Sequence, residues 1–373
     1  MNILSIGGRY KPTNGGNAKR ISTMCEAFCK AGHCVTVMTC DGYDNCPKQD
    51  IIEGVRIKRY MDCNMLVMDV LSTASEFSAT IILVHEETYL RKLKRLKPLQ
   101  PIVYECHAIE PNPNRIKEFV LSIVRKFYFN KSFTKRVFVL SKKAGKSFSE
   151  RFLYPEALTV YAPNGLDKNN YYTKNMHYGE QEHFVYGYGG TLYEFQGIFV
   201  IMKYMKDILN IAPDVRIMIV GGGPLENDVK AFVSDNHIED RVTVTGSVSQ
   251  ERFDELTQTF DVMLMPRPSL SSTESAVPLK IFDAAIHKKP VVMSNVSGLT
   301  EAFSDSAALI YDTKTPDDFV ECCKKIYRNT ELAEKLVKGE EEALDKWPSI
   351  ENVAKIQLNA MEQVIKESMN NGN

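Results

Sequence analysis

The sequence lacks several features that would restrict its function at once. It has no run of about 18 apolar residues, so no membrane-spanning helix is predicted. Residues 1–8 predict a buried strand and not a signal peptide. The nine cysteines show no Cys-x-x-Cys spacing and no zinc-like Cys/His cluster, so we expect reduced thiols in a cytoplasmic protein without a bound metal. The formal net charge of -1 gives no overall attraction to nucleic acid.

Short apolar runs alternate with helical patterns along the chain, which predicts βαβ units and parallel sheets. The pattern restarts after a polar segment at 164–181, so two domains are expected. Strands are predicted at 2–6, 35–39, 80–84, 102–104, 137–140 and 158–161, and then at 184–188, 216–220, 242–245, 262–265, 290–293 and 308–311. We place an N-terminal domain at 1–165, joined by a final helix at 348–370, and a C-terminal domain at 182–345.

Two glycine-rich turns follow predicted strands. In the first, Gly15 and Gly16 precede a helix whose free N–H groups favour an anionic ligand, although an ordinary connecting loop explains the pattern equally well. The second turn contains Gly221 and Gly223. It departs from the dinucleotide fingerprint, because Glu226 stands where the third glycine belongs. A Rossmann oxidoreductase is therefore disfavoured.

The segment 265–285 is the most informative part of the sequence. Arg267 lies in a Pro-Arg-Pro context, and Pro278 suits the first position of a helix that also carries Lys280 and Asp283. The two cations and the helix N-terminus predict a cradle for a diphosphate, and Asp283 could bind ribose hydroxyls. The alternative is a capped surface helix with solvated charges.

The order of these motifs resembles the GT-B glycosyltransferases of the large retaining family numbered four, also called glycosyltransferase group 1. The resemblance covers nearly the whole chain and rests on the Gly15-Gly16 loop, Pro163-Asn164-Gly165-Leu166-Asp167, Gly189-Gly190-Thr191, Gly221-Gly222-Gly223-Pro224-Leu225 and Pro278-x-Lys280-x-x-Asp283. It implies a GT-B fold, in which two doubly wound Rossmann-like domains face a central cleft. It also implies a metal-independent transfer of sugar with retention of configuration.

The same resemblance implies the roles of individual residues. Catalysis is expected to involve His107, which follows a predicted strand, together with Arg267 and Lys280. Donor binding is expected at Gly15, Gly16, Gly190, Thr191, Gly221, Gly223, Glu274, Val277, Pro278, Leu279 and Asp283. No cofactor is expected, and the donor substrate would be a UDP- or GDP-sugar.

The sequence departs from the family pattern at two places. Asp283 stands at the second position of the family's Glu-x7-Glu pair, but Ser275 occupies the first, with Glu274 beside it. Basic residues are frequent in the family at the positions of Thr191 and Gln196, which are uncharged. Two hypotheses follow: an active hexosyltransferase-like enzyme of surface polysaccharide or glycolipid synthesis, and a non-catalytic protein that binds sugar nucleotide or partners a related enzyme.

Residues 91–136 carry 12 Lys or Arg against three Glu, with apolar residues between them. Such a basic amphipathic stretch is typical of a membrane-surface element, although apolar residues facing a core with solvated charges explain it as well. A lipid-linked acceptor at the inner membrane face is thus one hypothesis, a glycan acceptor another, and nucleic acid is not an expected partner.

Overall fold

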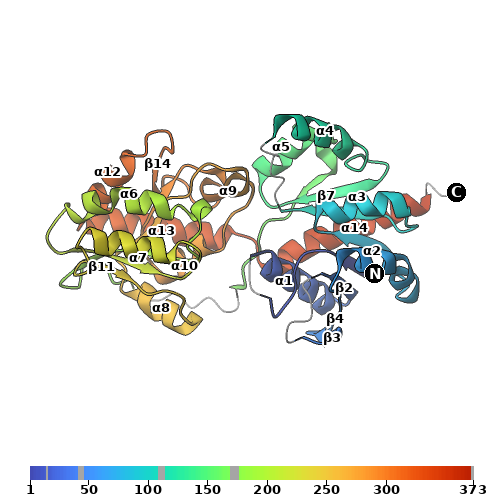
Figure 1. The fold of residues 1–373 in the computed structure, drawn as a ribbon, viewed down its shortest axis with the longest axis horizontal. Helices are drawn as coiled ribbons and strands as arrows, with labels where there is room; N and C mark the ends of the chain where they lie inside the picture. Colours follow the sequence, from blue (N-terminus) through green and yellow to red (C-terminus); the bar gives the residue numbers. More distant parts are fainter. Residues whose placement is uncertain (14–15, 41–45, 108–113, 169–175, 371–373) are drawn as a thin grey trace. The chain divides into compact units, whose positions relative to one another are not determined.

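The computed structural model describes residues 1–13, 16–40, 46–107, 114–168 and 176–370 (Figure 1). It consists of two compact units. Met1–Leu166 and Pro348–Asn373 form the N-terminal unit, and Asp167–Trp347 form the C-terminal unit. Gly15, one of the predicted donor-binding residues, lies outside the described residues.

The N-terminal unit alternates strands and helices as parallel α/β domains do. Its strands are β1 (Asn2–Ile6), β2 (Cys34–Thr39), β3 (Gln49–Ile52), β4 (Val55–Arg59), β5 (Ile81–Val84), β6 (Ile102–Cys106), β7 (Thr134–Val139) and β8 (Thr159–Tyr161). Its helices are α1 (Gly16–Lys30), α2 (Cys63–Glu76), α3 (Glu87–Leu96), α4 (Arg115–Lys126), α5 (Lys142–Phe152), the 3₁₀ turn η1 (Glu156–Leu158) and α14 (Ile350–Asn370).

Among the described residues, these eight strands form one sheet in the order β3-β4-β2-β1-β5-β6-β7-β8. The β3–β4 pair is antiparallel, and the other neighbours are parallel. Consecutive strand residues point to opposite faces. Accordingly, Ile81 and Leu83 pack with α1 and α14, whereas Ile82 and Val84 pack with α2, α3 and α5. Both faces are covered, which explains why these strands are apolar throughout.

The C-terminal unit repeats this architecture. Its strands are β9 (Phe184–Gly189), β10 (Val215–Val220), β11 (Val242–Val244), β12 (Val262–Met265), β13 (Val291–Ser294) and β14 (Ala308–Tyr311). Its helices are η3 (Glu194–Gln196), α6 (Ile198–Leu209), α7 (Glu226–Asp235), α8 (Gln250–Gln258), α9 (Ser271–Ser275), α10 (Lys280–His287), α11 (Ser297–Thr300), α12 (Asp318–Ile326) and α13 (Thr330–Lys346).

The second sheet has the order β11-β10-β9-β12-β13-β14, and its neighbouring strands pair in parallel. In chain order this is 3-2-1-4-5-6, the doubly wound arrangement of dinucleotide-binding folds. The chain leaves β9 toward β10 on one side of the sheet, and β12 begins the other side. Loops that follow β9 and β12 therefore diverge at the carboxyl edge, where ligands bind in such sheets.

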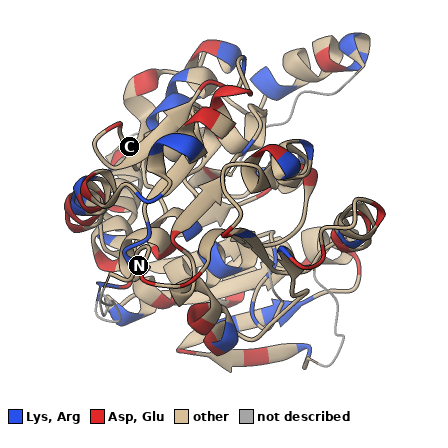
Figure 2. Cartoon of the chain, turned by 90° about the vertical axis from the view of Figure 1, so that its left-hand side faces the viewer, with Lys and Arg blue, Asp and Glu red and all other residues tan. Residues whose placement is uncertain are grey.

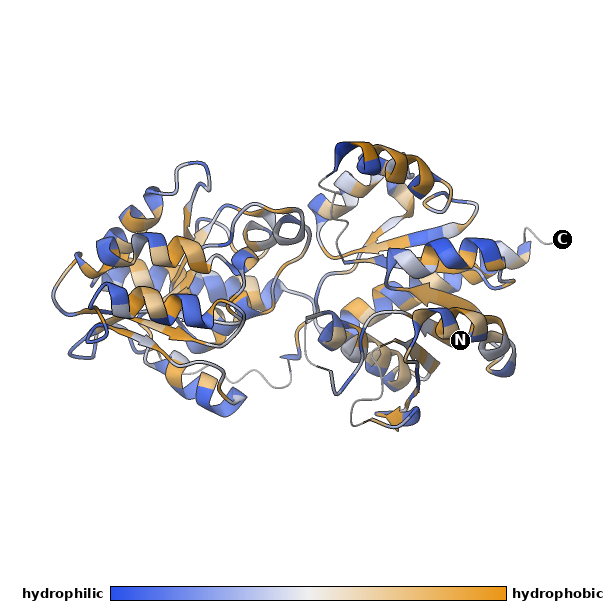
Figure 3. Ribbon diagram, in the orientation of Figure 1, coloured by the Kyte–Doolittle hydropathy of each residue, from blue (hydrophilic) through white to orange (hydrophobic). Residues whose placement is uncertain are grey.

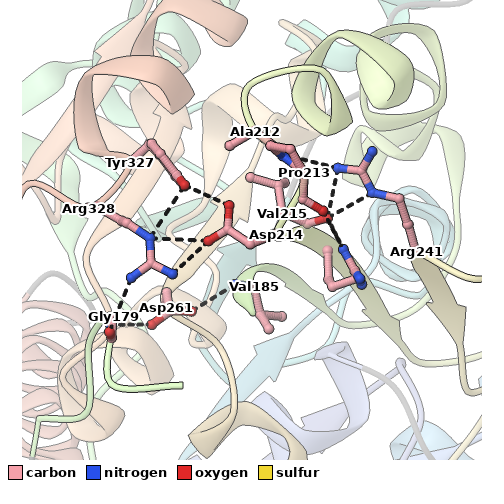
Figure 4. A network of polar contacts seen from close by, with 11 residues as sticks. Gly179, Val185, Ala212, Pro213, Asp214, Val215, Arg241, Asp261, Tyr327 and Arg328 are labelled. Atoms are coloured by element: carbon pink, nitrogen blue, oxygen red, sulfur yellow. Dashed lines mark hydrogen bonds and ion pairs between the residues drawn. The ribbon is translucent and has the colours of Figure 1, made fainter. Parts of the chain in front are cut away.

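Polar contacts fix the opposite, amino-terminal edge of the second sheet (Figure 4). Asp261 accepts hydrogen bonds from the backbone N of Val185 at 2.7 Å and of Gly179 at 2.6 Å. Asp214 accepts from the hydroxyl of Tyr327 at 2.6 Å and pairs with Arg328 at 2.6 Å. These side chains stabilise the amino-terminal edge by contacts within the unit, so we expect a ligand site at the carboxyl edge.

The charged residues of the helices are mixed in sign. Figure 2 shows Lys and Arg as well as Asp and Glu on the helices, in agreement with the formal net charge of -1, although α3 and α4 are predominantly basic. No helix among the described residues is both long and apolar enough to cross a bilayer. The nine cysteines are free, as expected.

A buried carboxylate connects four elements of the N-terminal unit. Glu105 on β6 accepts hydrogen bonds from Arg20 of α1 at 2.9 Å, from His85 after β5 at 3.0 Å and from Gln357 of α14 at 2.8 Å. Arg20 also donates to the carbonyl of Ala162 at 2.9 Å. Arg20 and the other donors hold the pKa of Glu105 well below its usual value, despite the opposing effect of burial. The carboxylate therefore stays ionised and holds the first and last helices on the sheet.

We predict that Arg20→Met lowers the free energy of unfolding by about 3–5 kcal/mol, because it leaves a buried carboxylate without its cation. Urea unfolding followed by far-UV circular dichroism measures the change. Arg136→Met is the matched control. Arg136 pairs with Glu367 at 2.6 Å near the surface, so its loss should cost about 1 kcal/mol or less. Equal losses in the two variants would contradict a special role for the buried pair.

Candidate functional site

The candidate site lies at the carboxyl edge of the second sheet, where its winding reverses. Gly190 and Thr191 directly follow β9, and Arg267 follows β12. Lys280 is the first residue of α10, two positions after Pro278, where the sequence predicted the helix to begin. Three chain segments that are distant in sequence thus bring the predicted cations and the glycine loop to one edge.

The glycines at this edge allow two loops to pack backbone against backbone. Gly190 donates to the carbonyl of Val220 at 2.9 Å, and a Cβ atom on Gly221 would lie 2.1 Å from the carbonyl oxygen of Gly190. A Cβ atom on Gly223 would lie 2.8 Å from the backbone N of Leu192. Gly221 and Gly223, predicted to bind donor, are therefore required for loop packing in any case. Gly190 differs, because a Cβ atom there would face Lys280 Nζ at 3.3 Å.

Lys280 is a half-buried residue whose terminal Nζ atom is buried. Its Nζ atom has no hydrogen-bond partner among the described residues and lies 4.9 Å from the centre of the Tyr188 ring. Burial, with a smaller contribution from the charge of Arg267, lowers the pKa of Lys280 to about 7, and Asp283 opposes the shift. The aromatic face stabilises the ammonium group only in part.

Arg267 is the second buried cation. Only 6% of it is exposed, and its Nε atom has no hydrogen-bond partner among the described residues. Burial lowers its pKa to about 10. Its backbone is fixed, because the carbonyl accepts a hydrogen bond from Ser294 Oγ at 2.6 Å. Two adjacent buried cations are costly for the protein alone and attractive to an anion.

Val277, Pro278 and Leu279 form the approach to α10. Val277 is buried, and Leu279 is the N-cap in helical conformation. Asp283 lies in the first turn of the helix, close enough to Lys280 to raise its pKa. A helix N-terminus, a lysine and an arginine at one edge are together suited to a phosphate group.

Glu274 has a structural task that the sequence did not indicate. Its Oε1 atom accepts a hydrogen bond from Ser269 Oγ at 2.7 Å, and its Oε2 atom accepts from the backbone N of Ser297 at 2.8 Å and from the Ser297 hydroxyl. Ser275 donates to the carbonyl of Ser271 at 2.5 Å. Glu274 thus ties α9 to the start of α11, and it would have to exchange these bonds to contact a ligand.

In the N-terminal unit the predicted site residues are less clustered. Gly16 begins α1 and is exposed, and a Cβ atom there would meet no described atom within 4 Å. Packing among the described residues therefore does not require a glycine at position 16. His107 directly follows β6, so it belongs to a different unit from Arg267 and Lys280.

His107 presents a neutral imidazole. Burial lowers its pKa to about 4, although Glu105 opposes the shift. Its Nε2 atom lies 3.5 Å from Glu105 Oε2 and has no hydrogen-bond partner among the described residues. The ring is 5.8 Å from that of His85.

His85, Glu105 and His107 bring three potential metal-ligand atoms within 4.8 Å of one another. However, His85 Nε2 already contacts Ser5 Oγ at 2.9 Å, and His85 Nδ1 contacts Glu105 at 3.0 Å. Arg20 occupies the other carboxylate oxygen. The donor set therefore fits a hydrogen-bond network better than a cation site.

Three comparisons with known proteins bear on this site. The family model described as glycosyl transferases group 1 matches residues 183–329. The curated alpha-D-kanosaminyltransferase of Streptomyces kanamyceticus is 20% identical over 164 residues, which cover 43% of this chain. The match spans only 41% of that enzyme's length. The resemblance to the group 1 family is thus confirmed, and it is carried by the C-terminal unit.

Solved structures extend the likeness to the fold of the whole chain. Sucrose-phosphate synthase of Thermosynechococcus elongatus has a TM-score of 0.79 at 16% identity, covering 98% of this chain and 100% of that one. HepE of Anabaena, solved in complex with UDP, has a TM-score of 0.75 at 16% identity with the same coverage. The predicted fold class, GT-B with two doubly wound Rossmann-like domains, is confirmed.

Tyr188 and Glu105 were missed by the sequence reasoning. Each is a buried strand residue with a polar group, and Glu105 is a charge inside the apolar run 102–106. A charged residue in such a run is a usable signal, because buried charges are rare unless paired. The partners of both residues lie far away in sequence and carry no such signal.

Removal of the buried ammonium group is predicted to stabilise the protein. Lys280→Met should raise the free energy of unfolding by about 0.5–2 kcal/mol near pH 7, because a buried ammonium group without a hydrogen-bond partner among the described residues is replaced by an apolar side chain. The folded pKa of about 7 is below the usual 10.5, so the penalty is complete below pH 7 and fades as the pH rises toward 10.5. Urea unfolding at pH 6.5 and 9.5 measures the difference.

Lys230→Met is the matched control for this prediction. Lys230 pairs with Glu226 at 2.7 Å on the exposed side of α7, so its replacement should change stability little at either pH. If Lys280→Met is destabilising at pH 6.5, the ammonium group has a partner that stabilises it, and the argument for an anion site is wrong.

Proposed function

We propose that the protein is a glycosyltransferase that moves a sugar from a nucleoside diphosphate sugar, with UDP- or GDP-sugar as donor. The observation that carries this proposal is a pair of cationic groups at the switch point of the second sheet: the buried side chain of Arg267 and the buried Nζ atom of Lys280. The group 1 match at 183–329 and the likeness to HepE, a protein solved with UDP, support the same ligand class.

The chemistry follows from where charge develops. As the bond between sugar and phosphate breaks, negative charge grows on the departing diphosphate. Fixed cations that meet this charge lower the barrier without a covalent step. Arg267 offers guanidinium donors, and Lys280 offers a point charge. We propose that these two side chains supply the positive charge needed, that transfer needs no metal, and that it retains the anomeric configuration.

Under this proposal, some of the predicted donor-binding residues would contact the donor and others would only shape the loop. Gly190, Thr191 and Val277–Leu279 would let the backbone approach the donor, and Asp283 would contact the ribose. Gly221 and Gly223 would shape the loop by packing. Gly15 and Gly16 stay predicted donor-binding residues, and the N-terminal unit would hold the acceptor.

The acceptor we propose is a glycan or a lipid-linked glycan, in the synthesis of a surface polysaccharide or glycolipid in the cytoplasm, at the inner membrane face. The alternative is a non-catalytic protein that binds sugar nucleotide or partners a related enzyme. Glu274 favours that alternative, because Ser269 and Ser297 donate hydrogen bonds to its two carboxylate oxygens. Chromatography of the protein incubated with the matching sugar nucleotide distinguishes these two hypotheses. An enzyme would release free sugar or form a transfer product, and a non-catalytic protein would do neither.

Nucleotide binding tests the donor site directly. We expect one nucleoside diphosphate among UDP, GDP, ADP and dTDP, with CMP included for comparison, to raise the melting temperature equally with and without EDTA. Lys280→Met should weaken binding of this nucleoside diphosphate by about 10–100-fold, because a hydrogen bond to a charged group contributes a free energy of that size. Lys230→Met should bind as the wild type does. Equal affinities of the Lys280 variant and the wild type would contradict the proposal that Lys280 binds the diphosphate.

The lysine pKa gives this test a second readout. At pH 8 an amine with a pKa of about 7 is mostly neutral, and a bound diphosphate should raise that pKa. Binding at pH 8 is therefore expected to take up as much as one proton per site. Calorimetry in two buffers of different ionisation enthalpy measures this uptake, which should vanish in Lys280→Met.

We propose that His107 hydrogen-bonds a sugar or acceptor hydroxyl through its neutral Nε2 atom. His107→Ala should reduce kcat by about 10²–10⁴-fold if the ring transfers a proton, while nucleotide affinity stays unchanged. With a pKa of about 4, the ring should remain competent down to pH 5. Rate measurements from pH 5 to 8 test this, and a loss of rate following a pKa near 6.5 would contradict the assignment.

A further inference from the structure

Helix α4 turns its apolar side outward. Its outward apolar side chains have exposed fractions from 46% to 77%, whereas Leu121 and Val124 are half-buried and Val124 packs against the core. The outward side chains are Ile116, Phe119, Val120, Ile123 and, at the C-cap, Phe127. Their spacing places them on one side of a helix with about 100° between successive residues. In Figure 3 the hydrophobic colour runs along α4, which Figure 1 labels.

The inner side of α4 is held to the domain by ion pairs as well as by the packing of Val124 on the core. Arg125 is the only buried residue of this helix. It pairs with Glu87 of α3 at 2.8 Å and with Glu118 of its own helix at 3.0 Å, and Arg151 of α5 also contacts Glu118. An ordinary surface helix has the reverse arrangement, with its apolar side on the core. The ion pairs fix the helix in this orientation, so the apolar side is not available to the core of this unit.

Basic residues border the apolar side. Arg115, Lys117 and Lys126 are exposed, and helical spacing places Arg115 and Lys126 at one edge of the apolar stripe and Lys117 at the other. Long basic side chains can keep their charge in the headgroup layer while their stems and apolar neighbours enter it. An apolar stripe between cationic edges is complementary to an anionic lipid surface.

We propose that α4 docks the N-terminal unit onto an anionic bilayer, inserting Phe119, Ile123 and their apolar neighbours at the headgroup boundary. A lipid surface fits better than a protein partner. A stable protein interface buries about 800 Å² on each partner and has few charges in its core. One helix of about 18 Å with charged edges offers less. This deepens the proposed location at the inner membrane face and rests on it for the kind of membrane, although docking itself requires neither donor nor acceptor.

Vesicle flotation of the full chain without nucleotide tests the proposal. The wild type should float with vesicles of 30% phosphatidylglycerol in phosphatidylcholine at low salt, and less in 0.5 M salt. Phe119→Ser/Ile123→Ser and Lys117→Glu/Lys126→Glu should each weaken binding by at least about tenfold. Met65→Ser/Met68→Ser is the matched control, because it removes two exposed apolar side chains from α2 of the same unit and should bind normally.

A second readout separates insertion from simple adhesion. The chain has one tryptophan, Trp347, which is buried in the C-terminal unit. Phe119→Trp should therefore add an emission that shifts to the blue with these vesicles and is quenched by brominated lipid. Absence of flotation, or equal flotation of all variants, would overturn the proposal, as would a wild-type dimer in sedimentation that Phe119→Ser/Ile123→Ser dissociates. Unchanged nucleotide melting shifts in the α4 variants would keep this test distinct from that of the donor site.

Discussion

The N-terminal unit depends on one buried ion pair, Arg20 with Glu105. The carboxylate lies on β6, between β5 and β7, and receives donors from α1, from the end of β5 and from α14. Because α14 ends the described chain and α1 begins near its start, Glu105 joins the two ends of the described chain in one unit. Pairing offsets the cost of burying this charge, and here every partner comes from a different element.

The C-terminal unit uses buried charge in the opposite way. Lys280 and Arg267 are withdrawn from water, yet Lys280 Nζ and Arg267 Nε have no hydrogen-bond partner among the described residues. The same physics that makes the Arg20–Glu105 pair a structural device makes these two cations a cost, which an anionic ligand would remove. They lie at the switch point of a doubly wound sheet, which is where ligands bind in such folds.

The strands of both sheets could be predicted because parallel strands buried on two faces are continuous apolar runs. The β3–β4 hairpin was missed. In β4 buried Val55, Ile57 and Arg59 alternate with less buried residues, and this period of two was a signal in the sequence, whereas β3 has only exposed and half-buried residues. Lys280 and Arg267 were predicted as site residues from the order of the motifs. The contact of Tyr188 with Lys280 and the hydrogen bonds from serines to Glu274 could not be predicted, because contacts between distant segments leave no local pattern in the sequence.

Helix α4 shows what periodicity can and cannot decide. Its sequence predicts an amphipathic helix, but the 3.6-residue period is the same whether the apolar side faces a core or the outside. The ion pairs of Arg125 and Glu118 decide between them, since charges that bind inward leave the apolar stripe outward. The contact that fixes this orientation involves α3 and α5, beyond any window of the α4 sequence. The sequence therefore defines the amphipathic element, and the tertiary structure determines the surface it presents.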